Sequence, residues 1–195
     1  QYIFKHPLGF IETSTGFEPL FSFAAGGLAQ AWTGGSYPFN EEDLADFPLQ
    51  YKDLESYYGD VAKRIGVIGT DDDLSQFFPL HDNLLSPITF DEHSQLLVDR
   101  YHKKRDKLNA KTGVYLGRSR VAVLSKDQDG RKACDYSGRC LWGCPTDSLY
   151  VPSVTLEQCK RFSNFTYFAN RMVTHFKYDA NQRIEAVIAH KPGET

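Results

Sequence analysis

The chain has 195 residues, and its 22 Lys and Arg against 25 Asp and Glu give a formal net charge of −3. Its 41% hydrophobic and 14% aromatic residues can form a buried core, which excludes a disordered or fibrous chain. Because it lacks the basic excess that counterion release rewards, nucleic acid is not an expected partner. No apolar run approaches the ~20 residues needed to cross a bilayer, so no transmembrane segment is expected.

The segment from Phe21 to Phe39 is rich in glycine, alanine and serine. Two Gly-Gly pairs flank Trp32, at Gly26-Gly27 and Gly34-Gly35. Glycine has no Cβ and tolerates positive φ, so this stretch suits a loop in which the backbone approaches a flat ligand or another strand. An ordinary glycine-rich turn is the alternative that the residues alone leave open.

A first helix is predicted over Leu54–Ile65. Asp53 is the expected N-cap residue and Gly66 the expected end, and the apolar residues between them recur at helical spacing.

A second helix is predicted to begin at Thr89, which forms a capping box with Glu92 and is followed by an apolar stripe. The stripe comprises Phe90, Leu97, Tyr101 and Leu108. The charged run at residues 102–107 is interpreted as a solvated helix face, because Asp106 interrupts it.

Beyond Gly113 the pattern changes from helical to alternating. Val114–Leu124 is rich in β-branched residues, and Phe165–Tyr178 and Arg183–His190 read as two strands joined by a turn at residues 179–182. A short helix over Ser153–Phe162 precedes these two strands. Helices followed by strands, without an internal repeat, indicate the α+β fold class.

Three of the four cysteines, Cys134, Cys140 and Cys144, fall within eleven residues. Thiolates spaced along a glycine-bearing loop can converge on one metal centre, and a cysteine followed by proline is typical of iron-sulfur ligation. Zinc requires four donors, and Cys159 would be the fourth only if its helix folded back. A disulfide would leave one of the three cysteines over and is disfavoured, whereas free thiols and a metal or cluster site both remain open.

The run from Gly26 to Gly35 reads GGLAQAWTGG and is followed by Asp46-Phe47-Pro48, Tyr51-Lys52-Asp53-Leu54 and Tyr57-Tyr58. This combination resembles the flavin-contacting stretch of the glucose-methanol-choline (GMC) oxidoreductases. The resemblance continues at Arg131–Cys134, through the cysteine loop and into residues 165–173. Residues 66–108 match only as a variable helical insertion.

The resemblance implies that residues 1–195 are a single fragment of a GMC-type FAD-binding fold. Residues 1–50 would be the flavin-contacting segment, residues 51–112 the helical insertion, and residues 113–195 the strands and cysteine loop of the FAD domain. The pyrophosphate-binding Gly-x-Gly-x-x-Gly turn of this family is absent from the sequence. The resemblance therefore implies a middle segment of a longer protein.

The cofactor-binding residues implied by the resemblance are Gly26, Gly27, Trp32, Thr33, Gly34, Gly35 and Val173. Ala29 stands where many family members have serine, which removes one hydroxyl near the cofactor. Ala31 stands where some sugar-oxidising members attach FAD through histidine, so covalent flavin is not expected.

The implied activity is that of an FAD-dependent oxidoreductase that oxidises an alcohol group of a sugar or polyol by hydride transfer to flavin. The family's catalytic histidine lies near its far C-terminus, so the resemblance places no catalytic residue in this chain. None of the six histidines here is expected to serve as the base.

Some membrane-associated sugar dehydrogenases of this kind carry a 3Fe-4S cluster on cysteines with the same spacing. By resemblance, Cys134, Cys140 and Cys144 would hold such a cluster and pass electrons to a cytochrome or quinone acceptor. Ser137 replaces a further cysteine that many relatives have. The alternative function is a self-contained cysteine-loop module, metal-binding or structural, without flavin.

Overall fold

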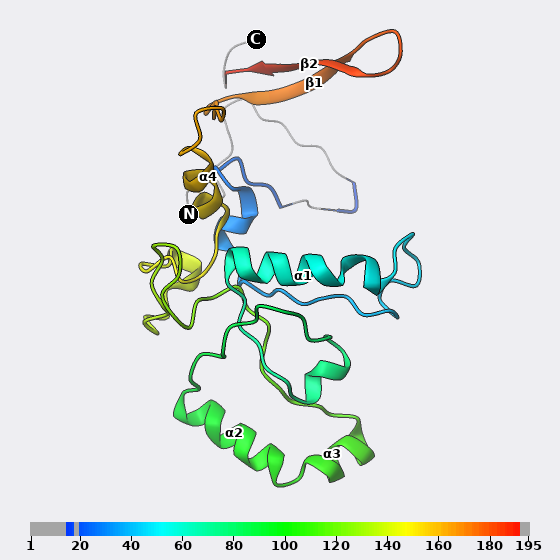
Figure 1. The fold of residues 1–195 in the computed structure, drawn as a ribbon, viewed down its shortest axis with the longest axis vertical. Coiled ribbons are helices and arrows are strands. Elements are labelled where there is room, and N and C mark those ends of the chain that lie inside the picture. The colour runs from blue at the N-terminus through cyan, green and yellow to red at the C-terminus, as the bar shows by residue number, and fades with distance from the viewer. Residues whose placement is uncertain (1–14, 18–19, 192–195) are drawn as a thin grey trace. The chain divides into compact units, whose positions relative to one another are not determined.

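The structure is a computed structural model that describes residues 15–17 and 20–191 (Figure 1). The chain forms two compact units. The first unit combines Gln1–Ala31 with Val151–Thr195, and the second unit is Trp32–Tyr150. Helices together with a two-stranded antiparallel sheet make the fold a mixed α+β structure, which confirms the predicted class at this level. None of the described helices has the length and apolar character that a membrane span requires.

Helix α1 (Tyr51–Ile65) belongs to the second unit and confirms the first predicted helix. The predicted N-cap was wrong, because the helix begins earlier and Gln50 occupies that position. Asp53 lies three residues further on, where its carboxylate accepts a hydrogen bond of 3.0 Å from the Gln50 N–H. Gly66 ends the helix as predicted, with a positive φ of 77° that favours glycine.

The core of the second unit lies against the C-terminal half of α1. It consists of Ala62, Ile65, Val67 and Ala122, with Trp32, Leu84 and Tyr150 packed against them. Segments far apart in the sequence therefore share one apolar cluster, which makes this unit a folded body in its own right.

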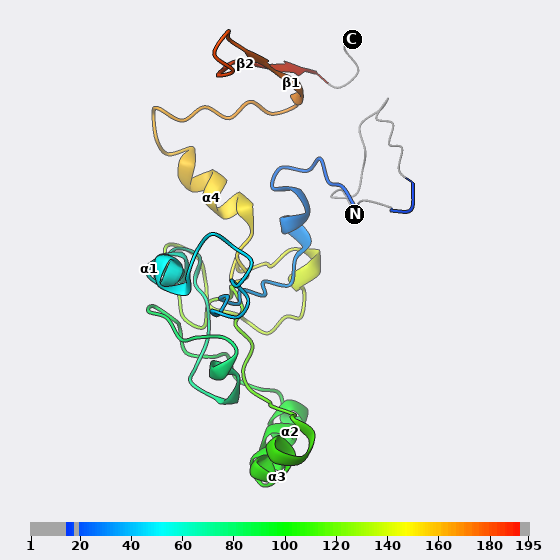
Figure 2. The ribbon, with the colours of Figure 1, turned by 90° about the vertical axis from the view of Figure 1, so that its right-hand side faces the viewer.

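The predicted helix over residues 89–108 is instead two helices, α2 (Glu92–His102) and α3 (Arg105–Thr112) (Figure 2). The capping prediction was also wrong, because Asp91 caps α2 by accepting from the Ser94 N–H at 2.9 Å. The break falls inside the charged run at residues 102–107, where no apolar side chain holds the helix to a core. The run is exposed throughout, as predicted, although Arg105 also forms an ion pair with Asp73.

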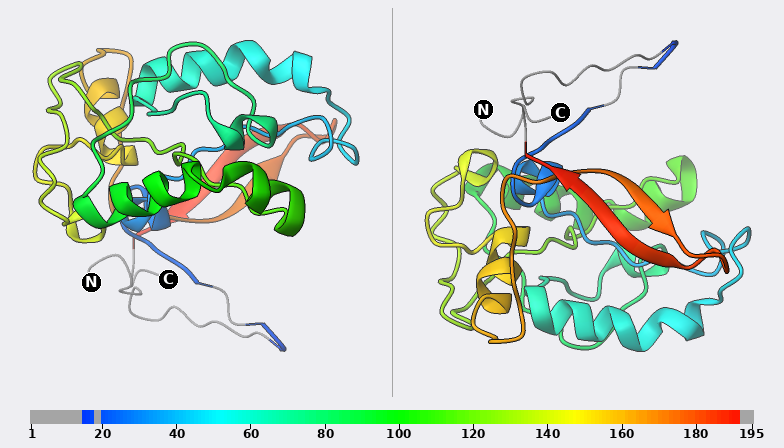
Figure 3. Two further views of the ribbon diagram at one scale, coloured as in Figure 1. Left: turned by 90° about the horizontal axis from the view of Figure 1, so that it is seen from below. Right: turned by 90° about the horizontal axis from the view of Figure 1, so that it is seen from above.

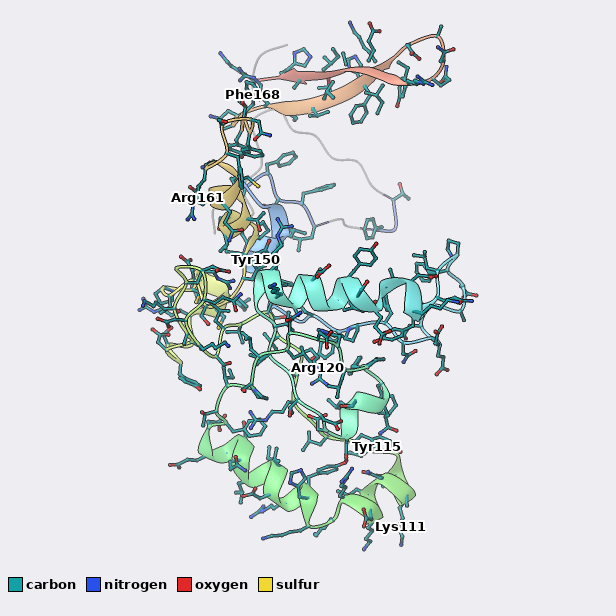
Figure 4. All side chains as sticks on the ribbon, in the orientation of Figure 1. Lys111, Tyr115, Arg120, Tyr150, Arg161 and Phe168 are labelled. Atoms are coloured by element: carbon teal, nitrogen blue, oxygen red, sulfur yellow. The ribbon has the colours of Figure 1, made fainter. Side chains whose placement is uncertain are left out.

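Residues 114–124 form neither a helix nor a regular strand. Val121 bridges to both Gly35 and Ile68, and Val123 bridges to Leu149. The change away from a helical pattern after Gly113 is therefore seen, while strand pairing is limited to single bridges. Ala122 and Leu124 are fully buried, as is Arg120, which is labelled in Figure 4.

Arg131 holds together the two ends of the segment that carries the three clustered cysteines. Its guanidinium donates to the backbone carbonyls of Ile65, Asp147 and Ser148 at 2.8–2.9 Å. Burial lowers the pKa of this guanidinium from its ordinary value, although nearby Asp147 favours the charged form. Arg131 therefore joins both ends of the cysteine segment to the end of α1.

The first unit contains the 3₁₀ helix η2 (Gly27–Ala31), helix α4 (Pro152–Cys159) and the strands β1 (Met172–Tyr178) and β2 (Ile184–His190) (Figure 3). Helix α4 packs against η2, and β1 pairs with β2 in antiparallel register. The two predicted strands, their turn and the short helix are confirmed, with the first strand starting later than predicted. Phe162, the last residue of the predicted helix, is 65% exposed and lies beyond the end of α4.

Candidate functional site

Trp32 anchors the glycine-rich segment to the second unit. Its indole N–H donates to the Tyr150 carbonyl at 2.6 Å, and its ring meets the Tyr150 ring edge to face at a centroid distance of 6.5 Å. In the backbone that follows, Gly34 is buried while Thr33 and Gly35 are exposed. The predicted residues Trp32–Gly35 thus form one short segment with an inner and an outer side.

The backbone of this segment is fixed by a bridge between Gly35 and Val121. The Ser36 N–H donates to Arg120 O at 2.9 Å, and the Ala122 N–H donates to Gly34 O at 2.7 Å. In this antiparallel pattern the bridged residue itself turns its N–H away from the partner strand. Accordingly, Gly35 N–H makes no hydrogen bond with any described residue.

The two glycines of this segment have different reasons to lack a side chain. Gly34 has a φ of 78°, and a Cβ there would lie 2.6 Å from Leu149 Cδ1, so the fold itself requires glycine. Gly35 has no positive φ, and a Cβ would meet only the Tyr37 ring at 3.4 Å. Protein packing therefore explains Gly34 and leaves the bare backbone at Gly35 unexplained.

The remaining residues that the resemblance assigns to the cofactor belong to the first unit. Gly26 and Gly27 have φ values of 95° and 61°, and Gly27 begins η2 after donating to Ala24 O at 2.8 Å. Val173 lies on β1, where it pairs with Ala189 and is 53% exposed. The predicted cofactor-binding residues therefore come from both units.

The three clustered cysteines are free thiols in the structure, with Cys140 exposed and the other two half-buried. Within the described ranges, no group of three or more His, Cys, Asp or Glu side chains is arranged to hold a metal ion. The arrangement seen here therefore does not fit a cluster or zinc ion on Cys134, Cys140 and Cys144. Cys159 belongs to the first unit and is also a free thiol.

Cys144 has the most structured surroundings of these thiols. Burial raises its pKa, but hydrogen bonds to the sulfur from the Thr146 hydroxyl (3.4 Å) and the Leu149 N–H (3.5 Å) outweigh this effect. Its pKa consequently lies below the ordinary value, which increases the share of reactive thiolate at neutral pH.

A buried polar cluster lies elsewhere in the second unit, centred on Asp73. The carboxylate accepts from the Tyr101 hydroxyl and from Arg105 Nε, which lies 2.9 Å away, and it forms an ion pair with Arg105. With its amide nitrogen facing the hydroxyl, Asn109 donates to Tyr101 Oη at 2.8 Å and to Val114 O at 2.7 Å. Burial alone would raise the pKa of Asp73, but the donors from Tyr101 and Arg105 hold it below 3.8. The cluster joins α2 and α3 to the 3₁₀ helix η3 (Asp73–Gln76).

The described residues of the second unit form at least two cavities. The larger, of about 550 Å³, lies between η3, α2 and residues 116–118, and the smaller, of about 450 Å³, lies between α1 and residues 80–82. None of the predicted cofactor-binding residues lines either cavity. Sequence analysis missed the larger cavity, although the acidic triplet at residues 71–73 and the two arginines Arg105 and Arg118 were visible signals.

No known protein-family model and no curated protein matches this chain. The functional reading therefore depends on the residues and geometry described above.

Proposed function

We propose that the chain forms part of an FAD-dependent oxidoreductase of the GMC type, acting on an alcohol group of a sugar or polyol. The support from the sequence is the combined block from Gly26 to Tyr58. The support from the geometry is the exposure of Thr33 and Gly35 on either side of the buried Gly34.

The bare backbone at Gly35 is the observation that carries the proposal. Gly35 is exposed, its N–H is turned outward, and neither its φ nor its packing requires glycine. A flat, polar ring system that approaches the backbone closely would explain both the missing side chain and the free donor. Thr33, two residues before Gly35 and also exposed, offers a hydroxyl as a second polar group.

In this proposal the protein's own residues position the cofactor. Trp32, held by the Tyr150 carbonyl and the core, fixes the segment, and the Gly35 N–H and Thr33 hydroxyl face the ring. Gly26, Gly27 and Val173, which the resemblance also assigns to the cofactor, belong to the first unit. FAD bound there would supply the hydride-accepting chemistry, while the protein supplies orientation and electrostatic surroundings.

The cysteine loop is given no role in electron transfer in this proposal, because the three thiols do not fit a metal centre as arranged here. The base that removes the alcohol proton is proposed to lie outside this chain.

Flavin binding is the direct test. We expect the protein purified from its complete gene to carry flavin, and Gly35→Val to reduce FAD affinity at least ~10-fold, because a branched side chain would separate the ring from the backbone donor. Ser119→Val, an exposed change on the neighbouring segment, is the matched control and should leave affinity unchanged. Absence of flavin absorbance, with none gained on adding FAD, would exclude the proposal.

A further inference from the structure

The larger cavity of the second unit contains charged groups that the fold itself does not use. Its wall combines apolar side chains with Asp71, Asp72, Asp73, Arg105 and Arg118. The apolar part comprises Phe90, Val98 and Leu116. Its volume of about 550 Å³ accommodates a small organic molecule.

Arg118 is a fixed cation that makes no side-chain salt bridge with a described residue, although the nearby Asp72 carboxylate favours its charged form. Its guanidinium lies 3.2 Å from the centroid of the Phe90 ring, and Nη1 donates to Ile88 O at 2.5 Å. Burial lowers its pKa from the ordinary value. A planar guanidinium held in this way keeps N–H donors free for a carboxylate ligand.

Two of the three carboxylates on the cavity wall are already engaged. Asp72 accepts from the backbone N–H groups of Leu74 (2.9 Å) and Arg118 (2.6 Å). Asp73 is bound by Tyr101 and Arg105.

Asp71 is different, because it is exposed and makes no hydrogen bond or ion pair with any described residue. The cavity therefore presents one unpaired carboxylate, one unpaired guanidinium and an apolar surface.

The charges on the cavity wall favour a ligand of both signs over a simple anion. With the imidazole of His102 neutral, three carboxylates against two guanidiniums leave the wall with a net negative charge, which opposes a ligand that is only anionic. A ligand that is only cationic would leave Arg118 unpaired. A zwitterion satisfies both groups and adds no net charge.

We propose that this cavity binds a small amino carboxylate, whose carboxylate contacts Arg118, whose ammonium contacts Asp71 and whose carbon chain lies against Val98 and Leu116. This site is separate from the proposed flavin contacts and does not depend on them.

Four probes of matched chain length test the proposal by titration calorimetry on the full chain. Norvaline and δ-aminovalerate carry both charges, whereas valerate carries only the carboxylate and pentylamine only the ammonium. We expect at least one of the zwitterions to bind at least ~10-fold more tightly than both single-charge probes, because each charged contact contributes about one decade of affinity. No binding by either zwitterion, or equal binding by valerate or pentylamine, would overturn the proposal.

Substitutions then assign the contacts. Asp71→Asn should weaken the zwitterion at least ~10-fold without weakening valerate, and Arg118→Lys should weaken both. Asp60→Asn, an exposed change on α1, is the control for a lost carboxylate and should have no effect. Because Asp71 is exposed and unpaired, Asp71→Asn tests the site even if Arg118→Lys fails to fold. An unchanged zwitterion affinity in Asp71→Asn would contradict the assignment.

Discussion

The core of the second unit and the β1–β2 hairpin of the first unit are built from similar residues but bury them differently. In the core, Ala122 and Leu124 are fully buried although their segment forms only isolated bridges. In the hairpin, antiparallel pairing extends along both strands with two register irregularities, yet Phe176, Ile184 and Val187 are each about half exposed. Hydrogen-bond regularity and burial are therefore separate properties, and apolar burial is the one expected to stabilise this chain.

The largest expected effect comes from Leu124→Ala, since Leu124 is fully buried against Gly66. We expect it to lower the free energy of unfolding by about 2–5 kcal/mol, because it removes buried methyl groups and leaves a cavity. Val187→Ala in the hairpin should change it by about 0.5 kcal/mol or less.

Urea unfolding followed by Trp32 fluorescence in a Trp142→Phe background measures this difference. Trp32 packs on the core, whereas Trp142 is 80% exposed and would obscure the signal. Equal losses for the two variants would break the comparison, because they would show that the hairpin is as tightly buried as the core.

A smaller effect is expected at Arg131, which joins the cysteine segment to the core through backbone carbonyls. Arg131→Gln should cost about 1 kcal/mol for each of the three lost hydrogen bonds, because the carbonyls of Ile65 and Ser148 are bonded in the buried interior. It should also speed the reaction of Cys134 and Cys144 with a thiol reagent, since their segment would open.

Arg139→Gln is the matched control, as Arg139 is exposed on the same segment. Unchanged stability and thiol reactivity in Arg131→Gln would show that the loop is held by other contacts.

The smallest expected effect concerns Asp73, whose pKa is held below 3.8 by Tyr101 and Arg105 despite its burial. A depressed pKa stabilises the folded state above the unfolded value of about 3.9, and this contribution is lost as pH falls through the folded pKa. Asp73→Asn should therefore reduce stability by about 1–3 kcal/mol at pH 7. The difference from the parent protein should shrink below about pH 4.

Thermal unfolding across this pH range measures the effect, with Asp60→Asn as the control. A stability difference that stays constant down to low pH would contradict the assigned cause.

The sequence by itself determined the elements whose signals are local. Helix α1 and its end at Gly66, the short helix α4 and the β1–β2 hairpin follow from spacing, a glycine and turn residues. The sequence did not determine that Gln50, and not Asp53, is the N-cap of α1. It also did not determine that the second predicted helix breaks after His102. At both places neighbouring residues offer competing alternatives.

Tertiary structure decided which polar groups are buried and with what they pair. Arg120, Arg131 and Asp73 lie in segments that read as ordinary charged or alternating sequence, and only folding brings Arg131 to Ile65 O and Asp73 to Tyr101. Tertiary structure also decided that packing requires glycine at position 34 but not at position 35. That difference depends on Leu149, which is more than a hundred residues away in the sequence. Contacts between residues far apart in the sequence leave no local pattern, because they do not recur at the regular spacing by which helices and strands are predicted.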